Sequence, residues 1–393
     1  MKFKDMNIEQ SVLGSLDGIG FEKPTKIQSE TIPIIKQGHD VIGQSETGSG
    51  KTAAFGIPLV EKVAKDGGIQ ALILAPTREL AMQIAKNLRE YSSLKELYVQ
   101  TIYGGAPMEP QTRGLRNAEI VVGTPGRILD HMRRGTMNLS NVKVFVLDEA
   151  DKMIDMGFID DIKKIEKNIP KSRQTLLFSA TMPSGLTKIV SSFTNNAKKI
   201  KTKTKVEESL LKQYYYDIDY RRKFSLLVHL IEEEKPGLAI IFCNTRRDTD
   251  NVNNNLKENG INSMGLHGGL SQQRREKVIE RFHKGKSKVL VATDVAARGL
   301  DIKNVTHIFN YDIPQNPEEY TNRIGRTARA GRYGKAISLL TNDDHNSFRK
   351  IITSFSYNIE KMKTPNFKIL SFKVQRNRGF RRFGPQGRKY TKR

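Results

Sequence analysis

The stretch that decides the fold reads Asp40-Val41-Ile42-Gly43-Gln44-Ser45-Glu46-Thr47-Gly48-Ser49-Gly50-Lys51-Thr52. A β-branched run leads into a glycine-rich loop, and the apolar, helix-compatible segment AAFGIPLV follows. This order is typical of a phosphate-binding loop, because backbone N–H groups at a helix N-terminus wrap phosphate oxygens. Ser45 stands where the general pattern has glycine, so the loop by itself is an incomplete match.

The side chains of this loop predict how phosphate and metal would be shared. Lys51 is placed to reach the outer phosphates, and the Thr52 hydroxyl is placed to bind Mg²⁺. The remaining predicted phosphate contacts are Ser45, Thr47, Gly48, Ser49 and Gly50.

A second motif joins a buried strand to a cluster of acidic residues. The apolar run Val144–Leu147 leads straight into Asp148-Glu149-Ala150-Asp151. Buried carboxylates need a cation, so we expect Asp148 to hold Mg²⁺ and Glu149 to orient and deprotonate an attacking water. The alternative is an acidic helix N-terminus that complements the helix dipole.

Short apolar runs alternate with helical patterns along most of the chain. This alternation predicts an α/β fold of βαβ units with parallel sheets. The predicted strands of the first half are HDVIG, ALILAP, LYVQTIYGG, EIVVGTP, VKVFVLDE and TLLFSAT; those of the second half are LAIIFCNT, INSMGLHGG, SKVLVATD, VTHIFNYD and KAISLLT. The run KKIKTKTK between them is the predicted linker, so we expect domains at 1–204 and 205–365 and a disordered basic tail at 366–393.

The charge of the chain favours a polyanionic partner. The sequence has 66 Lys and Arg against 42 Asp and Glu, a formal net charge of +24. Residues 361–393 contain twelve Lys or Arg and no acidic residue. Such a surplus favours nucleic acid through phosphate neutralisation and counterion release.

Composition also predicts where the protein works. There is no apolar run long enough to cross a bilayer and no readable secretory signal, so we expect no membrane association. The one cysteine, Cys243, cannot form an internal disulfide, which agrees with a reducing compartment. We therefore expect a cytoplasmic protein.

Asp148-Glu149-Ala150-Asp151, together with the phosphate loop, resembles the signature of the DEAD-box ATP-dependent RNA helicase family. The resemblance implies two tandem RecA-like (P-loop) domains joined by a short linker, with ATP and Mg²⁺ as cofactors. Gly20–Gln28 is similar to the family's Q motif. There Phe21 would stack on adenine, and the Gln28 amide offers one donor and one acceptor that match adenine.

Further motifs resemble those of the family in the expected order. The implied RNA contacts are Thr77, Arg78, Gly105, Thr124 and Arg127 in the first half, and Arg275 and Thr293 in the second. The residues implied to couple hydrolysis to strand separation are Asp151, Ser179, Thr181 and Asn322, and Asp301 would contact the ribose or a water.

The motif Asn322–Arg329 resembles the segment that supplies arginine fingers. Arg326 and Arg329 would stabilise charge on the transferred phosphoryl group when the two domains close. Asn322 stands where histidine is common in the family, and Ala328 where glycine is common. Because Asn322 cannot carry a proton or a charge, the coupling between the domains or the turnover rate can differ from that of family members with histidine at this position.

The resemblance implies RNA-stimulated ATP hydrolysis coupled to local, non-processive RNA unwinding, on RNA of largely arbitrary sequence. Ribosomal precursors and the mRNA-decay machinery are candidate partners, and the core is expected to be monomeric. The basic tail, with Phe372, Phe380, Phe383 and Tyr390 among its cations, is predicted to bind RNA nonspecifically. The alternatives are an ATP-dependent RNA clamp that hydrolyses slowly, and a DNA-translocating motor.

Overall fold

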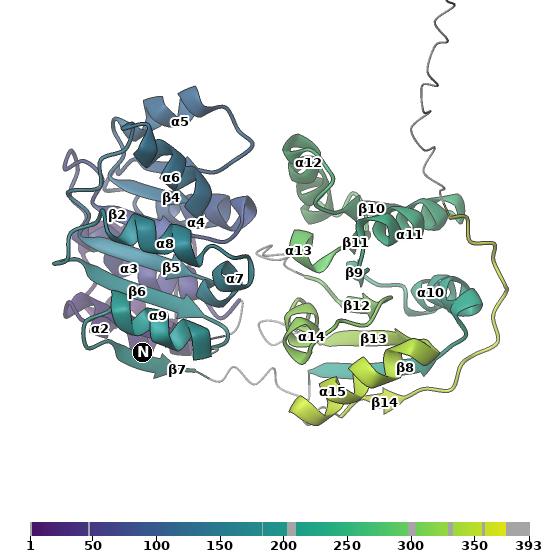
Figure 1. Ribbon diagram of the computed structural model, residues 1–393. Coiled ribbons are helices and arrows are strands. Elements are labelled where there is room, and N and C mark those ends of the chain that lie inside the picture. The colour runs from purple at the N-terminus through teal and green to yellow at the C-terminus, as the bar shows by residue number, and fades with distance from the viewer. Residues whose placement is uncertain are drawn as a thin grey trace, which may run out of the picture.

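The computed structural model describes residues 2–45, 48–182, 184–202, 210–297, 304–328, 333–355 and 358–374. These residues form two α/β domains, and each is built on a seven-stranded sheet in which all the paired strands are parallel (Figure 1). The predicted fold class, two tandem RecA-like domains, is confirmed.

The first domain contains all the strands predicted for it and one more, β7. Its elements are η1 Phe3–Met6, α1 Gln10–Gly18, α2 Lys26–Lys36, β1 Val41–Gln44, α3 Lys51–Lys62, β2 Ala71–Leu74, α4 Arg78–Tyr91, β3 Val99–Ile102, α5 Met108–Leu115, β4 Ile120–Gly123, α6 Pro125–Arg133, β5 Val144–Asp148, α7 Ala150–Asp155, α8 Ile159–Glu166, β6 Gln174–Ser179, α9 Ser184–Phe193 and β7 Lys198–Lys201. The strand order is β3-β4-β2-β5-β6-β1-β7.

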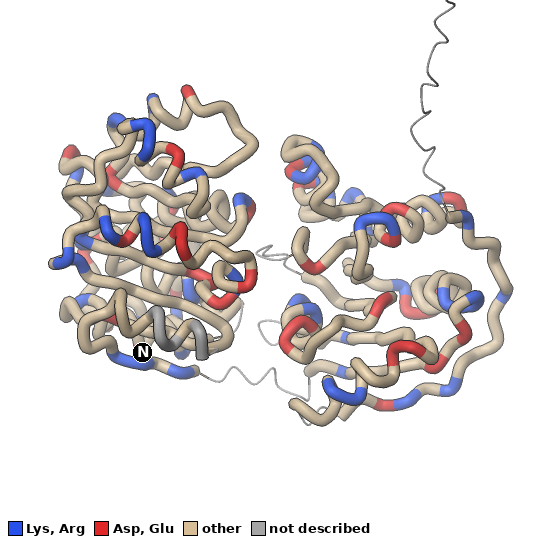
Figure 2. Tube along the Cα trace, viewed as in Figure 1, with Lys and Arg blue, Asp and Glu red and all other residues tan. Residues whose placement is uncertain are grey.

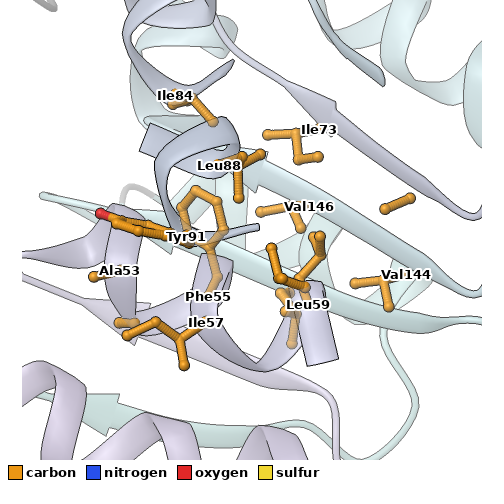
Figure 3. Close-up of a cluster of buried hydrophobic side chains, with 14 of the residues drawn as sticks. Ala53, Phe55, Ile57, Leu59, Ile73, Ile84, Leu88, Tyr91, Val144 and Val146 are labelled. Atoms are coloured by element: carbon orange, nitrogen blue, oxygen red, sulfur yellow. The ribbon is translucent and has the colours of Figure 1, made fainter. Parts of the chain in front are cut away.

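Helices cover both faces of this sheet, which explains why the strands β2, β4 and β5 inside it are almost entirely apolar. Val144 and Val146 of β5 point into one buried cluster with α1 to α4 (Figure 3). Phe145 and Leu147, between them in the sequence, point into a second cluster on the opposite face. Successive side chains of a strand alternate between faces, so a strand buried on both sides favours apolar residues at successive positions.

The second domain repeats this plan. Its elements are β8 Leu211–Asp217, α10 Tyr220–Glu234, β9 Ala239–Phe242, α11 Arg246–Glu258, β10 Ser263–Leu266, α12 Gln272–His283, β11 Val289–Ala292, α13 Asp294–Ala297, β12 His307–Asn310, α14 Pro317–Ile324, β13 Gly334–Leu340, η2 Asn342–Asp344, α15 His345–Phe355 and β14 Glu360–Lys361. The strand order is β10-β11-β9-β12-β13-β8-β14.

The predicted linker was wrong over its first half. Lys198–Lys201 is strand β7, which pairs with β1 in register Val41 to Lys198. Three of its four residues are exposed, as suits an edge strand rich in lysine. A short, charged edge strand has no apolar pattern from which the sequence could have predicted it.

The predicted start of the disordered tail was also wrong. Residues 362–374 run along the outer side of the second domain and end beside α11 (Figure 1). Phe372, expected among the free aromatic residues of the tail, packs against Phe224 of α10 with 5.0 Å between ring centroids. We call this segment, residues 362–374, the C-terminal strap. Residues 375–393 lie outside the described residues.

Within the described part of the chain, none of the helices combines the length and the apolar character needed to span a bilayer.

Candidate active site and RNA-contacting surface

The phosphate loop is held by the segment that precedes α2. Gly48 and Gly50 have φ of 86° and 94°, a left-handed conformation that favours glycine. Lys51 begins α3, and its Nζ donates a hydrogen bond of 2.7 Å to the Ser45 carbonyl inside the loop. The Lys51 ammonium therefore lies where the loop would enclose a phosphate.

Gln28 contacts the loop directly. Its Nε2 donates to the Gly50 carbonyl at 3.1 Å, and its Oε1 accepts from the Thr25 backbone N–H at 2.8 Å. Phe21 lies between Phe3 and Tyr91, with ring centroids 5.6 and 5.8 Å away. The structure thus joins Gln28 and Thr25, whose hydroxyl donates to the Ser49 carbonyl at 2.8 Å, to the phosphate loop, whereas Phe21 packs among aromatic rings.

Asp148 and Glu149 lie at the carboxyl end of β5 and are almost fully buried. Burial, helped by the neighbouring Glu149 charge, raises the pKa of Asp148 to about 7. Burial also acts to raise the pKa of Glu149, but the Lys152 and Lys51 cations outweigh it and hold that pKa below its usual value. The two carboxylates therefore have different electrostatic environments.

Lys152 is a site residue that the sequence analysis missed. Its Nζ lies 2.8 Å from Glu149 Oε1, and both side chains are about 5% exposed or less. Burial lowers the pKa of the Lys152 ammonium, and the nearby Arg326 lowers it further. Its position three residues after Glu149 was the available signal, because residues three apart lie on the same side of a helix.

The predicted coupling residues of the first domain form one network. Thr181 donates to Asp151 Oδ2 from both its backbone N–H, at 2.8 Å, and its hydroxyl, at 2.9 Å. The Asp151 N–H donates to Ser179 Oγ at 3.3 Å. The end of β6 is therefore tied to the start of α7, directly beside Glu149.

The predicted RNA contacts of the first domain meet at one end of its sheet. Arg78 follows β2, and its guanidinium lies against Gly105, which follows β3. Arg127 follows β4 and donates to the Ala106 carbonyl at 3.1 Å. Thr77 and Thr124 are the N-cap residues of α4 and α6. Strands β3, β4 and β2 therefore carry the predicted RNA contacts, while β5, β6 and β1 carry the nucleotide residues.

The arginine motif of the second domain is anchored by a buried residue that the sequence analysis did not select. Arg323 is 1% exposed and donates two hydrogen bonds to the Asp294 carboxylate, at 2.8 and 2.6 Å. It also donates to Asn244 Oδ1 at 3.0 Å. This network fixes the end of α14, where Asn322 and Arg326 lie. Arg323 lies in the recognised motif, but nothing in the sequence marks it as buried.

Asn322 faces the first domain. It lines a pocket of about 720 Å³ together with Asn316, Asp151, Lys152 and Thr181. Arg326 is close enough to lower the pKa of both Glu149 and Lys152. The second domain therefore presents its arginine motif to the acidic end of β5.

Ala328, one of the two departures from the family pattern, has φ of 53°. This left-handed conformation favours glycine, which explains why glycine is common at the position.

Among the predicted RNA contacts of the second domain, Thr293 is buried at the start of α13, and Arg275 of α12 forms an ion pair with Glu79 of the first domain. Thr47, Asp301 and Arg329 lie outside the described residues.

Together, the fold and this site define a two-domain P-loop ATPase. The family described as DEAD/DEAH box helicase matches residues 25–189, and the family described as Helicase conserved C-terminal domain matches residues 222–331. The chain is 46% identical over 366 residues to the DEAD-box ATP-dependent RNA helicase CshA of Geobacillus kaustophilus, covering 92% of this chain and 78% of that relative. It is 45% identical to CshA of Bacillus subtilis, covering 92% of this chain and 74% of the relative.

Solved structures are also similar to this chain over most of its length. S. cerevisiae Dbp5 bound to RNA and ADP BeF3 superposes with a TM-score of 0.84 at 34% identity, covering 92% of this chain and 95% of that one. S. cerevisiae Dbp5 bound to Gle1 and IP6 gives a TM-score of 0.79 at 34% identity, covering 93% and 95%.

The chain belongs to the DEAD-box ATP-dependent RNA helicase family. It is an RNA-dependent ATPase and RNA helicase, and it uses ATP and binds RNA. The family membership favours an RNA helicase over the two alternatives, the slowly hydrolysing RNA clamp and the DNA-translocating motor.

Proposed function

We propose that ATP is hydrolysed at the carboxyl ends of β1 and β5 and that hydrolysis drives local, non-processive opening of RNA held across both domains. The observation that carries this proposal is the position of Glu149. Its buried carboxylate lies under the influence of Lys51 from the phosphate loop and Arg326 from the other domain. A base for water activation is therefore near both the proposed phosphate-binding cation and a candidate arginine finger.

Within this proposal Lys51, together with Ser45, Thr47, Gly48, Ser49 and Gly50, binds the phosphates. Phe21 and Gln28 bind the adenine, and Asp301 contacts the ribose. Gln28 already bonds to the Gly50 carbonyl. Adenine recognition would therefore act on the same backbone that wraps the phosphates.

The site also fits Mg²⁺. The Asp148 carboxylate is buried, and burial raises its pKa to about 7, so it gains from a cation that keeps it ionised. The Thr52 hydroxyl would be its partner as a hard oxygen ligand. When bound, the ion would neutralise charge on the phosphates. Because Glu149 is not assigned to hold Mg²⁺ in this proposal, it can orient and deprotonate the water.

We propose that Arg326 and Arg329 stabilise the transferred phosphoryl group and that Asn322 couples the second domain to Asp151, Ser179 and Thr181. The pocket that Asn322 shares with Asp151 and Thr181 supports this coupling. The RNA backbone would cross Thr77, Arg78, Gly105, Thr124 and Arg127 in the first domain, then Arg275 and Thr293 in the second.

We propose that the protein is a cytoplasmic, monomeric enzyme that acts on structured RNA. A cytoplasmic, monomeric enzyme agrees with the single, buried Cys243 and with bacterial RNA helicases as relatives. Structured RNA, such as ribosomal precursors or mRNA undergoing decay, is the class of substrate that a sequence-independent backbone contact would serve.

The test is steady-state ATP hydrolysis by the purified protein alone, with single-stranded RNA and with DNA of equal length, at one stated salt concentration. Strong stimulation by RNA alone is expected. RNA binding with turnover at background would overturn the hydrolysis-driven mechanism.

A further inference from the structure

Helix α12 carries a stripe of cations on a face next to the one that bears Arg275. Arg274, Lys277, Arg281 and Lys284 are spaced three, four and three residues apart, so they lie along one side of the helix. All four are exposed. Figure 2 shows basic positions along α12 and α11 in the upper part of the second domain.

These cations border a groove of about 460 Å³ between α11, the edge strand β10 and α12. Lys257 and Lys286 also line it, so six Lys or Arg face two acidic residues. Each acid is already engaged: Asp250 with His267 at 2.9 Å, and Glu280 with Lys284 at 2.5 Å. Met264, Leu270 and Val278 supply an apolar lining. The groove is therefore cationic at its rim and partly apolar inside.

The C-terminal strap ends beside this groove. The Lys373 backbone N–H donates to Asn255 Oδ1 at 2.8 Å, and the Asn255 amide donates back to the Lys373 carbonyl at 2.9 Å. Lys373 Nζ also lies 2.9 Å from Glu258, the neighbour of Lys257. The next residues, 375–393, contain eight Lys or Arg and no acidic residue. The groove thus lies between Arg275 and the origin of the basic tail.

We propose that the α11–α12 groove binds the phosphate backbone of the RNA strand that flanks the core site, and so continues the RNA path from Arg275 toward the tail. The six cations match a polyanion, and the apolar lining suits a ribose or base face. RNA is favoured over an acidic polypeptide because the lining residue Arg274 adjoins the proposed RNA contact Arg275, and Lys257 adjoins Glu258, to which the strap that precedes the basic tail is bound. This inference rests on the proposed RNA path across the second domain.

The experiment compares the variant K277Q/R281Q with K163Q/K164Q, which removes the same charge from exposed positions of α8 in the first domain. Affinities are measured by fluorescence anisotropy for a short RNA that fills the core alone and for the same RNA with a single-stranded flank, at several salt concentrations. Circular dichroism melting confirms that both variants are folded.

The groove variant is expected to lose the flank's contribution, so the ratio of long-RNA to short-RNA affinity falls several-fold. Its salt slope on the long RNA should fall by about 1.4, two phosphates at about 0.7 each for single strands. The control should keep the wild-type ratio and slope.

Equal affinity ratios in the two variants would overturn the proposal that the groove binds RNA. Unchanged RNA binding together with loss of poly-glutamate binding would assign it to an acidic polypeptide instead. Because binding is measured directly, failure of RNA to stimulate ATPase would count against the proposed function alone.

Discussion

Arg275 of α12 lies across the domain boundary from Glu79 of α4, with 2.9 Å between the guanidinium nitrogen and Glu79 Oε1. The two side chains are 16% and 5% exposed. Arg275 is a proposed RNA contact, and in this structure the first domain already occupies its guanidinium. RNA and Glu79 would therefore compete for the same donor groups.

Replacing Glu79 with Gln should release Arg275. We expect the distance between the domains to broaden in the absence of RNA, as measured by fluorescence energy transfer between labels on the two domains. RNA affinity should rise several-fold, because Arg275 no longer has to leave a charged partner. Glu96→Gln, which breaks an exposed ion pair with Lys65 inside the first domain, is the control and should alter neither quantity. Reduced RNA affinity in Glu79→Gln would contradict the competition.

Replacing Glu149 with Gln tests water activation. The amide keeps the size of the side chain but cannot accept a proton, so turnover should fall by about 10² to 10⁴. ATP and RNA binding should remain, because neither ligand is assigned to Glu149. Loss of nucleotide affinity in an equilibrium titration would show that this carboxylate binds ATP or its metal.

Replacing Asn322 with His tests the departure from the family pattern. Asn322 lines the pocket with Asp151 and Thr181, and an imidazole there can donate a charged hydrogen bond to the Asp151 carboxylate. We expect a several-fold higher maximal RNA-stimulated turnover with little change in RNA affinity. A matched fall in both quantities would point to simple disturbance of the interface.

Two truncations separate the strap from the tail. Removing residues 375–393 should weaken RNA binding and flatten its salt dependence while leaving the melting temperature unchanged. Removing residues 366–393 also removes Phe367, Leu370 and Phe372, which pack on the second domain. At about 1 kcal/mol for each half-buried side chain, that loss should lower the melting temperature by roughly 6–12 °C. Equal melting temperatures for the two truncations would show that the strap adds no stability.

Stability should fall in mild acid because of His307. Burial lowers the pKa of this imidazole despite its contact with Glu234, so the folded state binds its proton less readily than the unfolded chain. The stability it contributes is present above the unfolded value of about 6.5 and is lost as pH falls below it. Urea unfolding at several pH values should show a smaller acid loss for His307→Gln than for wild type. His229→Gln, in the same domain, serves as the matched control.

The sequence alone determined the elements whose signal is local. Asp148-Glu149-Ala150-Asp151 after an apolar run and the loop through Lys51 predicted strand ends and their chemistry, because parallel strands buried on both faces are continuous apolar runs. The same patterns predicted every strand inside the two sheets except β8, Leu211–Asp217, in which lysine, glutamine and tyrosine interrupt the apolar run. The edge strands β7 and β14 had no such signal, since their side chains face solvent.

Tertiary structure decided what depends on residues far apart in the chain. The sequence places Phe372 in the tail, and only the tertiary structure shows that it packs against Phe224 of α10. The sequence predicts Arg275 as an RNA contact, and only the tertiary structure shows that Glu79 of the first domain pairs with it. Charge and side-chain type are written in the sequence, but burial and pairing are set by packing. Packing brings together residues that no sequence spacing relates.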